Sequence, residues 1–99
     1  MCFEFVYACK SSLIDELVKV IGTDKYFLLC FGHLNYFYCD NLASIQRVYD
    51  LLKSKGVVLH DVEETDLSSI IDAQYMRENH TFHGSAILLN KFREKSEIS

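Results

Sequence analysis

The chain has 99 residues, of which 49% are hydrophobic, 24% charged and 13% aromatic. A chain of this size can hide roughly 60–65% of its unfolded surface, which is enough for one core and argues against disorder. Ten Lys and Arg against 14 Asp and Glu give a net charge of −4, which argues against binding nucleic acid by neutralising phosphates. We therefore expect one compact domain over residues 1–99.

The first ten residues, MCFEFVYACK, lack the positively charged segment of a signal peptide. No run approaches the about 18 apolar residues that a membrane span requires. Together these features predict a cytoplasmic protein without a membrane partner.

The first third of the chain predicts a strand followed by a helix. Residues 2–9 alternate between two faces and are rich in aromatic side chains, which favours a central strand. Leu13 and Leu17 begin a helical spacing that predicts a helix over residues 12–21. Gly22 suits the end of that helix, because glycine readily adopts the left-handed conformation.

The run from Lys25 to Asp40, KYFLLCFGHLNYFYCD, is the most apolar and aromatic in the chain. It predicts a β-hairpin with arms at residues 25–31 and 36–40. Because the connection contains no Asn-Gly pair, we expect a loop longer than two residues around Gly32. The register of the hairpin stays open by one residue at this point.

A second helix and a fourth strand follow the hairpin. Asp40 or Asn41 begins a helix that Gly56 ends, and residues 57–62, VVLHDV, predict a strand. The element order β-α-β-β-α-β is that of ferredoxin-like folds, with both helices on one face of an antiparallel sheet. In this arrangement we expect the first and last strands in the centre and the hairpin toward one side.

The last third predicts two additional C-terminal helices, so the expected fold class is a ferredoxin-like α+β fold with this extension. Residues 63–66 predict an acidic turn, and residues 67–79 a third helix. A loop is expected at residues 80–84.

The fourth helix is expected to begin at Ser85, with Ile87, Leu88 and Phe92 facing inward. Residues 86–89 alone would also suit a short edge strand, and periodicity does not decide between the two. Residues 91–99 predict a polar, partly disordered tail.

The four cysteines lie in apolar segments and lack C-x-x-C spacing, which predicts free, buried thiols. The sequence does not decide whether Cys30 and Cys39 form a disulfide bridge, because this depends on the hairpin register.

No spacing of a known catalytic or metal site stands out, so we predict no cofactor, no metal and, on balance, no enzyme. An alternative is a small metal-dependent enzyme or ligand-binding domain that uses His60, Asp61, His80 and His83. Imidazole and carboxylate groups are suitable zinc ligands, although the spacing of these four residues matches no common ligand pattern.

A third hypothesis is single-stranded RNA binding on the aromatic side chains of the sheet, with Phe3, Phe5, Tyr36 and Tyr38 as the stacking residues. The acidic charge balance argues against it.

The main hypothesis is a small non-enzymatic protein-interaction or regulatory domain that acts as a homodimer. Its aromatic side chains exceed what one small core needs, and an edge strand or the aromatic sheet face would form the contact. The size and acidic surface also suit an accessory protein of a virus or mobile element. The interface candidates are Tyr26, Phe31, Tyr36, Phe37 and Tyr38.

Overall fold

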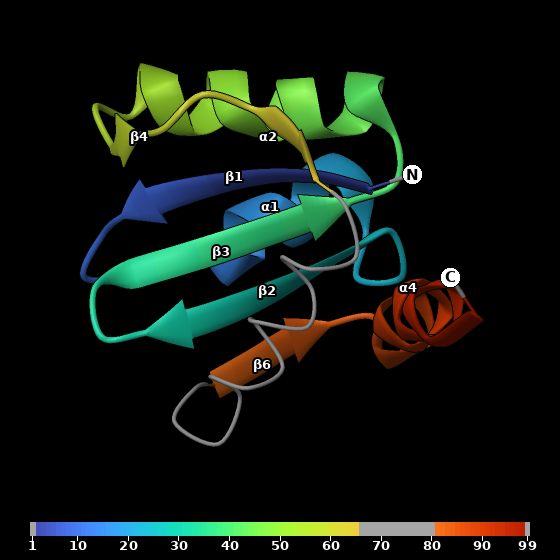
Figure 1. Ribbon diagram of the computed structural model, residues 1–99. Coiled ribbons are helices and arrows are strands. Elements are labelled where there is room, and N and C mark those ends of the chain that lie inside the picture. The colour runs from blue at the N-terminus through green and yellow to red at the C-terminus, as the bar shows by residue number, and fades with distance from the viewer. Residues whose placement is uncertain (1, 66–80, 99) are drawn as a thin grey trace.

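A computed structural model describes residues 2–65 and 81–98 of the chain (Figure 1). Over these residues it is an α+β fold with three helices and a six-stranded antiparallel sheet. The predicted helix over residues 67–79 lies outside the described residues. The elements are β1 (Cys2–Ala8), α1 (Ile14–Ile21), β2 (Tyr26–Phe31), β3 (Leu34–Cys39), α2 (Leu42–Ser54), β4 (Val58–Leu59), β5 (Glu63–Thr65), β6 (Thr81–Gly84) and α4 (Ala86–Ile98).

None of the helices in the described ranges is long and apolar enough to cross a membrane.

The strand order β4-β1-β3-β2-β6 places the hairpin strand β3 in the middle of the sheet. The expectation that the hairpin lies toward one side was therefore wrong, and β4 is at an edge instead of in the centre. β4 is at an edge because it pairs only with β1 among the described strands, and β6, which was expected to be a loop, adds a strand outside β2. Residues 81–84 pair with residues 27–30 of β2, and this pairing satisfies backbone groups of β2 that would otherwise form an open edge.

The hairpin connection is a two-residue turn, because Phe31 and Leu34 are the last register partners of β2 and β3. Gly32 has φ 60, which suits the first central position of a type II′ turn. The expected longer loop was wrong, since this turn needs glycine only at that position. In the resulting register Cys30 faces Asn35 and Cys39 faces Tyr26, so the two cysteines are not bridged. All four cysteines are free, as predicted.

One side of β1 is covered by two short strands instead of the single predicted strand over residues 57–62. β4 pairs with Tyr7 and Ala8, while β5 pairs with residues 2–4. Between them the backbone N–H of His60 donates to the carbonyl oxygen of Val6 at 2.9 Å. Residues 63–65, predicted as a turn, are a strand because the edge of β1 offers them backbone partners.

The two helix starts differ in how closely they follow the prediction. Asn41 begins α2, and its side-chain oxygen accepts a hydrogen bond from the Ser44 backbone N–H at 3.0 Å. In α1 the N-cap residue is Leu13, which makes no side-chain cap hydrogen bond, and the helix begins at Ile14 instead of at residue 12.

Helices α1 and α2 lie on the same face of the sheet (Figure 1), and the larger core lies beneath them. Phe37 stacks between Tyr26 and Phe5, with ring centroids 5.1 Å apart in both pairs. Much of the aromatic content of the chain is therefore used by this core. Its buried members are Phe5, Tyr7, Leu17, Tyr26, Leu28, Phe37, Cys39, Ile45, Val48 and Leu52.

Helix α4 packs on the opposite face of the sheet and forms a second, smaller core with Cys2, Phe27, Leu29 and Tyr38. Residues 86–89 are thus helical, not an edge strand, and the Leu88 backbone N–H donates to the Ser85 hydroxyl at 3.0 Å. The buried α4 side chains are Leu88, Leu89 and Phe92. The inward position predicted for Ile87 was wrong, since this side chain is 84% exposed.

Candidate functional site: the open half of the second sheet face

An exposed apolar row crosses four strands of the sheet on the face opposite α1 and α2. Val58 pairs with Ala8, Ala8 with Leu34, and Leu34 with Phe31. Direct register partners point to the same face, so these four side chains form one row, called here the open row. Val58 is 69% exposed, Phe31 44% and Leu34 40%.

The open row lies at the end of the sheet that α4 does not cover. Figure 1 shows α4 near the beginning of β1, whereas the β2–β3 turn and the end of β1 lie at the other end of the sheet. Single exposed apolar side chains are ordinary on protein surfaces, but a contiguous apolar patch often marks an interaction site.

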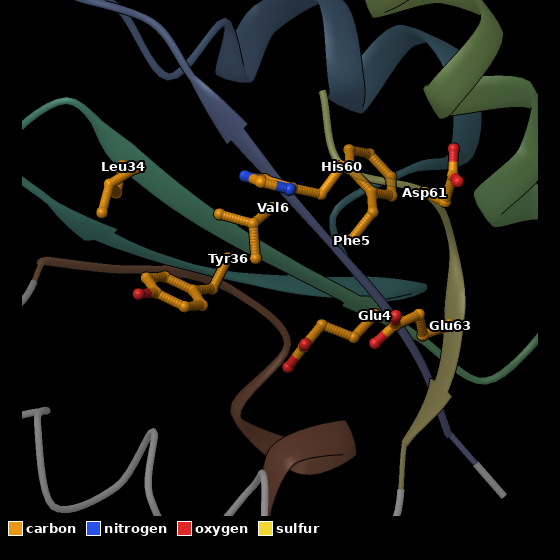
Figure 2. Close-up of a pocket in the computed structure, with 8 residues that line it drawn as sticks. All are labelled: Glu4, Phe5, Val6, Leu34, Tyr36, His60, Asp61 and Glu63. Carbon is orange, nitrogen blue, oxygen red and sulfur yellow. The ribbon is translucent and has the colours of Figure 1, made fainter. Parts of the chain in front are cut away.

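A groove of about 340 Å³ adjoins the open row (Figure 2). Val6 and Tyr36 line the groove and are register partners on the same face of the sheet as the open row. Leu34 belongs both to the groove and to the open row. The groove therefore continues the apolar surface toward the opposite end of β1. Its lining residues are Glu4, Phe5, Val6, Leu34, Tyr36, His60, Asp61 and Glu63.

Two carboxylates lie at the far end of the groove, because Glu4 of β1 and Glu63 of β5 are direct register partners. In Figure 2 both side chains extend to the same side, and the carboxylate of Glu4 reaches farther toward Tyr36 than that of Glu63. On the other side of β1 the partner of Glu4 is Tyr38. Burial is the main cause that raises the pKa of Tyr38. The charge of Glu4 and the hydrogen bond between the two side chains raise it further. Glu4 is thus held between a buried hydroxyl and a second carboxylate.

His60 and Asp61 are neighbours in sequence, but their side chains point in different directions in Figure 2. The Tyr49 hydroxyl donates to Oδ1 of Asp61 at 3.2 Å, which turns this carboxylate toward α2. His60 and Asp61 are therefore not arranged as a pair that acts on a common ligand.

The four residues of the metal hypothesis are not assembled in the part of the chain that the structure describes. His83 lies in β6 at the opposite edge of the sheet from His60, and His80 lies outside the described residues. Among the side chains that the structure describes, those of residues 2–65 and 81–92, no group of three or more His, Cys, Asp or Glu is placed to hold a metal ion.

Three of the four thiols, the buried Cys2 and Cys39 and the half-buried Cys30, are poor candidates for nucleophiles. Burial raises the pKa of Cys2 to about 12, and burial also raises the pKa of Cys30 and of Cys39. Because the thiolate is the reactive form, these groups are weakly reactive at neutral pH.

The predicted interface residues divide into two groups. Tyr26, Phe37 and Tyr38 are at most 1% exposed and belong to the two cores. Phe31 belongs to the open row and Tyr36 lines the groove.

The aromatic residues of the RNA hypothesis lie on two different faces. Phe3 and Phe5 pack in the core under the helices, whereas Tyr36 and Tyr38 belong to the opposite face. They do not form one stacking platform.

Sequence reasoning missed Glu4, Ala8, Leu34, Val58 and Glu63 as members of one surface. The alternation of residues 2–9 places Glu4 and Ala8 on the same face of their strand. Their partners come from distant segments, and only the strand order and register reveal them.

Comparison of the chain with protein-family models, with curated proteins and with solved structures finds no match.

Proposed function

We propose that the protein is a non-enzymatic interaction domain, which binds a segment of another protein on the open half of its second sheet face. The observation that supports this proposal most is the open row, with its apolar side chains aligned on four neighbouring strands. The groove beside it provides the concave continuation that a bound segment needs.

The surface has the layout of a protein–protein interface, in which an apolar centre is surrounded by a polar rim. Val6 and Tyr36 lie between the open row and the carboxylates of Glu4 and Glu63. Complete burial of a Val, Leu or Phe side chain is worth about 1.5–3 kcal/mol. Since Val58, Phe31 and Leu34 are already partly covered, we expect about 1 kcal/mol from each of these three side chains.

A homodimer, which the sequence suggests, is kept as a separate proposal with a different contact. A symmetric contact with its two-fold axis near Glu4 and Glu63 would bring these carboxylates of both copies together, and like charges oppose such a contact. Strand β6 is the last strand of the described strand order, and an edge strand readily pairs with a second copy. Sedimentation at high micromolar concentration tests the dimer, and a strictly monomeric species would contradict it.

An accessory role in a virus or mobile element stays a sequence-based prediction.

We also interpret β1 to β4 with α1 and α2 as a ferredoxin-like unit to which β5, β6 and α4 are additions. Two helices on one face and an order 4-1-3-2 that keeps β1 inside support this interpretation, although the central position expected for the last strand was wrong.

The interaction is tested by selecting random dodecapeptides displayed on phage against the wild-type chain and against a Leu34→Ser/Val58→Ser variant. The matched control is Leu42→Ser/Ile87→Ser, which removes two exposed apolar side chains outside the open row. We expect the wild type and the control to enrich the same peptides and the row variant to lose them. Equal enrichment by all three proteins, or none by the wild type, would contradict the proposal.

A further inference from the structure

We infer that the bound segment carries a basic side chain, preferably arginine, that lies between Glu4 and Glu63, and apolar side chains that cover the open row. This inference rests on the proposed function and specifies the chemistry of the partner. It is carried by the charge of the surface together with its apolar row.

The first argument is that Glu4 and Glu63, which are direct register partners, carry the same charge. Glu4 and Glu63 are directly opposite each other in an antiparallel pair, where like charges repel. Among the described residues that line the groove there is no Lys or Arg to neutralise them. A bound cation would relieve this repulsion, so the surface is complementary to a basic partner and not to an acidic one.

The second argument concerns the geometry of the two carboxylates. Directly opposed residues of an antiparallel pair have Cβ atoms about 4.5–5.5 Å apart. A guanidinium group offers several N–H donors in one plane and can bond two carboxylates at once, whereas an ammonium group acts as a point charge. The acidic end of the groove therefore favours arginine over lysine.

The third argument concerns the distance between the charged and apolar ends. Glu4 and Ala8 are four residues apart on β1, which corresponds to about 13 Å at 3.3 Å per residue. An extended partner would place its basic residue and the side chain above the open row about four positions apart. Val6 and Tyr36 fill the interval.

The test uses one peptide enriched by the wild-type chain, labelled for fluorescence anisotropy, and versions of it with the basic residue changed to Gln or Glu. We expect the dissociation constant to rise about tenfold when the Gln version binds the wild-type chain and when the unmodified peptide binds the Glu63→Gln protein. The Glu version should show no detectable binding. The matched control is Glu64→Gln, whose register partner is Phe3, with less than about a twofold change expected. Binding of the unmodified peptide should also weaken as NaCl rises from about 50 to about 300 mM.

The outcomes separate this inference from the proposed function. Peptides that require Leu34 and Val58 but lack basic residues, and bind Glu63→Gln as tightly as wild type, would overturn the inference and leave the interaction domain intact. Absence of any peptide that depends on the open row would overturn both. Self-association that Leu34→Ser abolishes would identify a second copy as the occupant and would also overturn the inference. Thermal unfolding of each variant verifies that it is folded.

Discussion

Glu4 and Glu63 face each other as direct register partners of β1 and β5, at one end of a groove that leads to an exposed apolar row. Like charges directly opposite each other in an antiparallel pair are destabilising, so we expect this pair to weaken the sheet and to give its open face a negative charge. Local features that cost stability are expected at functional sites, which is why this pair is central to the account.

The first prediction concerns the cost of this pair. Replacing Glu63 by Gln removes the repulsion and should raise the free energy of unfolding by about 0.2–1 kcal/mol in low-salt buffer at neutral pH. Urea denaturation measures the change, with Glu64→Gln as the control, because the register partner of Glu64 is the uncharged Phe3. A clear loss of stability in Glu63→Gln would show that the carboxylate is stabilising and would contradict this interpretation.

The second prediction compares two buried tyrosine hydroxyls. The Tyr26 hydroxyl has no hydrogen-bond partner among the described residues, whereas the Tyr7 hydroxyl donates to the carbonyl oxygen of Ser12. An unsatisfied buried polar group is costly, so Tyr26→Phe should stabilise the chain by about 1 kcal/mol. Tyr7→Phe should destabilise it by about 1 kcal/mol. Chemical denaturation of both variants measures the difference, and equal losses would contradict the prediction.

The third prediction concerns the junction of β6 with β2. Gly84 has φ 102, and a Cβ atom there would lie 2.9 Å from Cα of Phe27 and would clash with the Tyr26 carbonyl oxygen. Gly84→Ala should cost about 3 kcal/mol or more, since the strain of a positive φ adds to the clash. Gly56 has φ 77 with open space around it, so Gly56→Ala should cost only about 1–2 kcal/mol. Thermal unfolding that ranks Gly56→Ala as the worse variant would disprove the placement of β6.

The fourth prediction is a loss of stability at alkaline pH. Burial raises the pKa of Cys2 from 9.0 to about 12, and burial also raises the pKa of Tyr7 and Tyr38. Above pH 9 the unfolded chain releases the Cys2 proton while the folded chain retains it, so the free energy of unfolding falls as pH rises. Each such group contributes a slope of up to about 1.4 kcal/mol per pH unit.

Urea denaturation between neutral pH and about pH 11 measures this slope. Cys2→Ala should reduce it, because the substitution removes one of the groups. A free energy of unfolding that stays constant over the range would contradict the burial of these side chains.

The fifth prediction concerns the attachment of α4. Phe92 is 2% exposed in the second core, so Phe92→Ala should cost about 3 kcal/mol. Ile87→Ala, at a side chain that is 84% exposed on the same helix, should change stability by less than about 0.5 kcal/mol. Similar effects of the two substitutions on thermal unfolding would show that α4 does not pack on this face.

The features that could be predicted from sequence depend on local patterns. The alternation of residues 2–9 identified β1 and its two faces, and the helical spacing with Asn41 identified α2. Both arms of the hairpin were found, while its turn was misjudged because glycine in the first position was not recognised as sufficient.

The features that the sequence analysis predicted wrongly or missed depend on pairing between distant segments. Residues 81–84 have no strong strand pattern of their own, and they form β6 because β2 offers an unpaired edge. The candidate site depends on the same kind of information. Leu34 and Val58 become neighbours of Ala8, and Glu63 a neighbour of Glu4, only through the register of the sheet.

The most direct measurement of the central claim is a map of peptide binding by amide chemical-shift changes in the ¹⁵N-labelled protein. A peptide enriched by the wild type is added in steps, with its charge-reversed version as the control. The account predicts that the largest changes lie at Ala8, Phe31, Leu34, Val58 and Glu63. Changes centred on α1 and α2, with the open row unaffected, would contradict it.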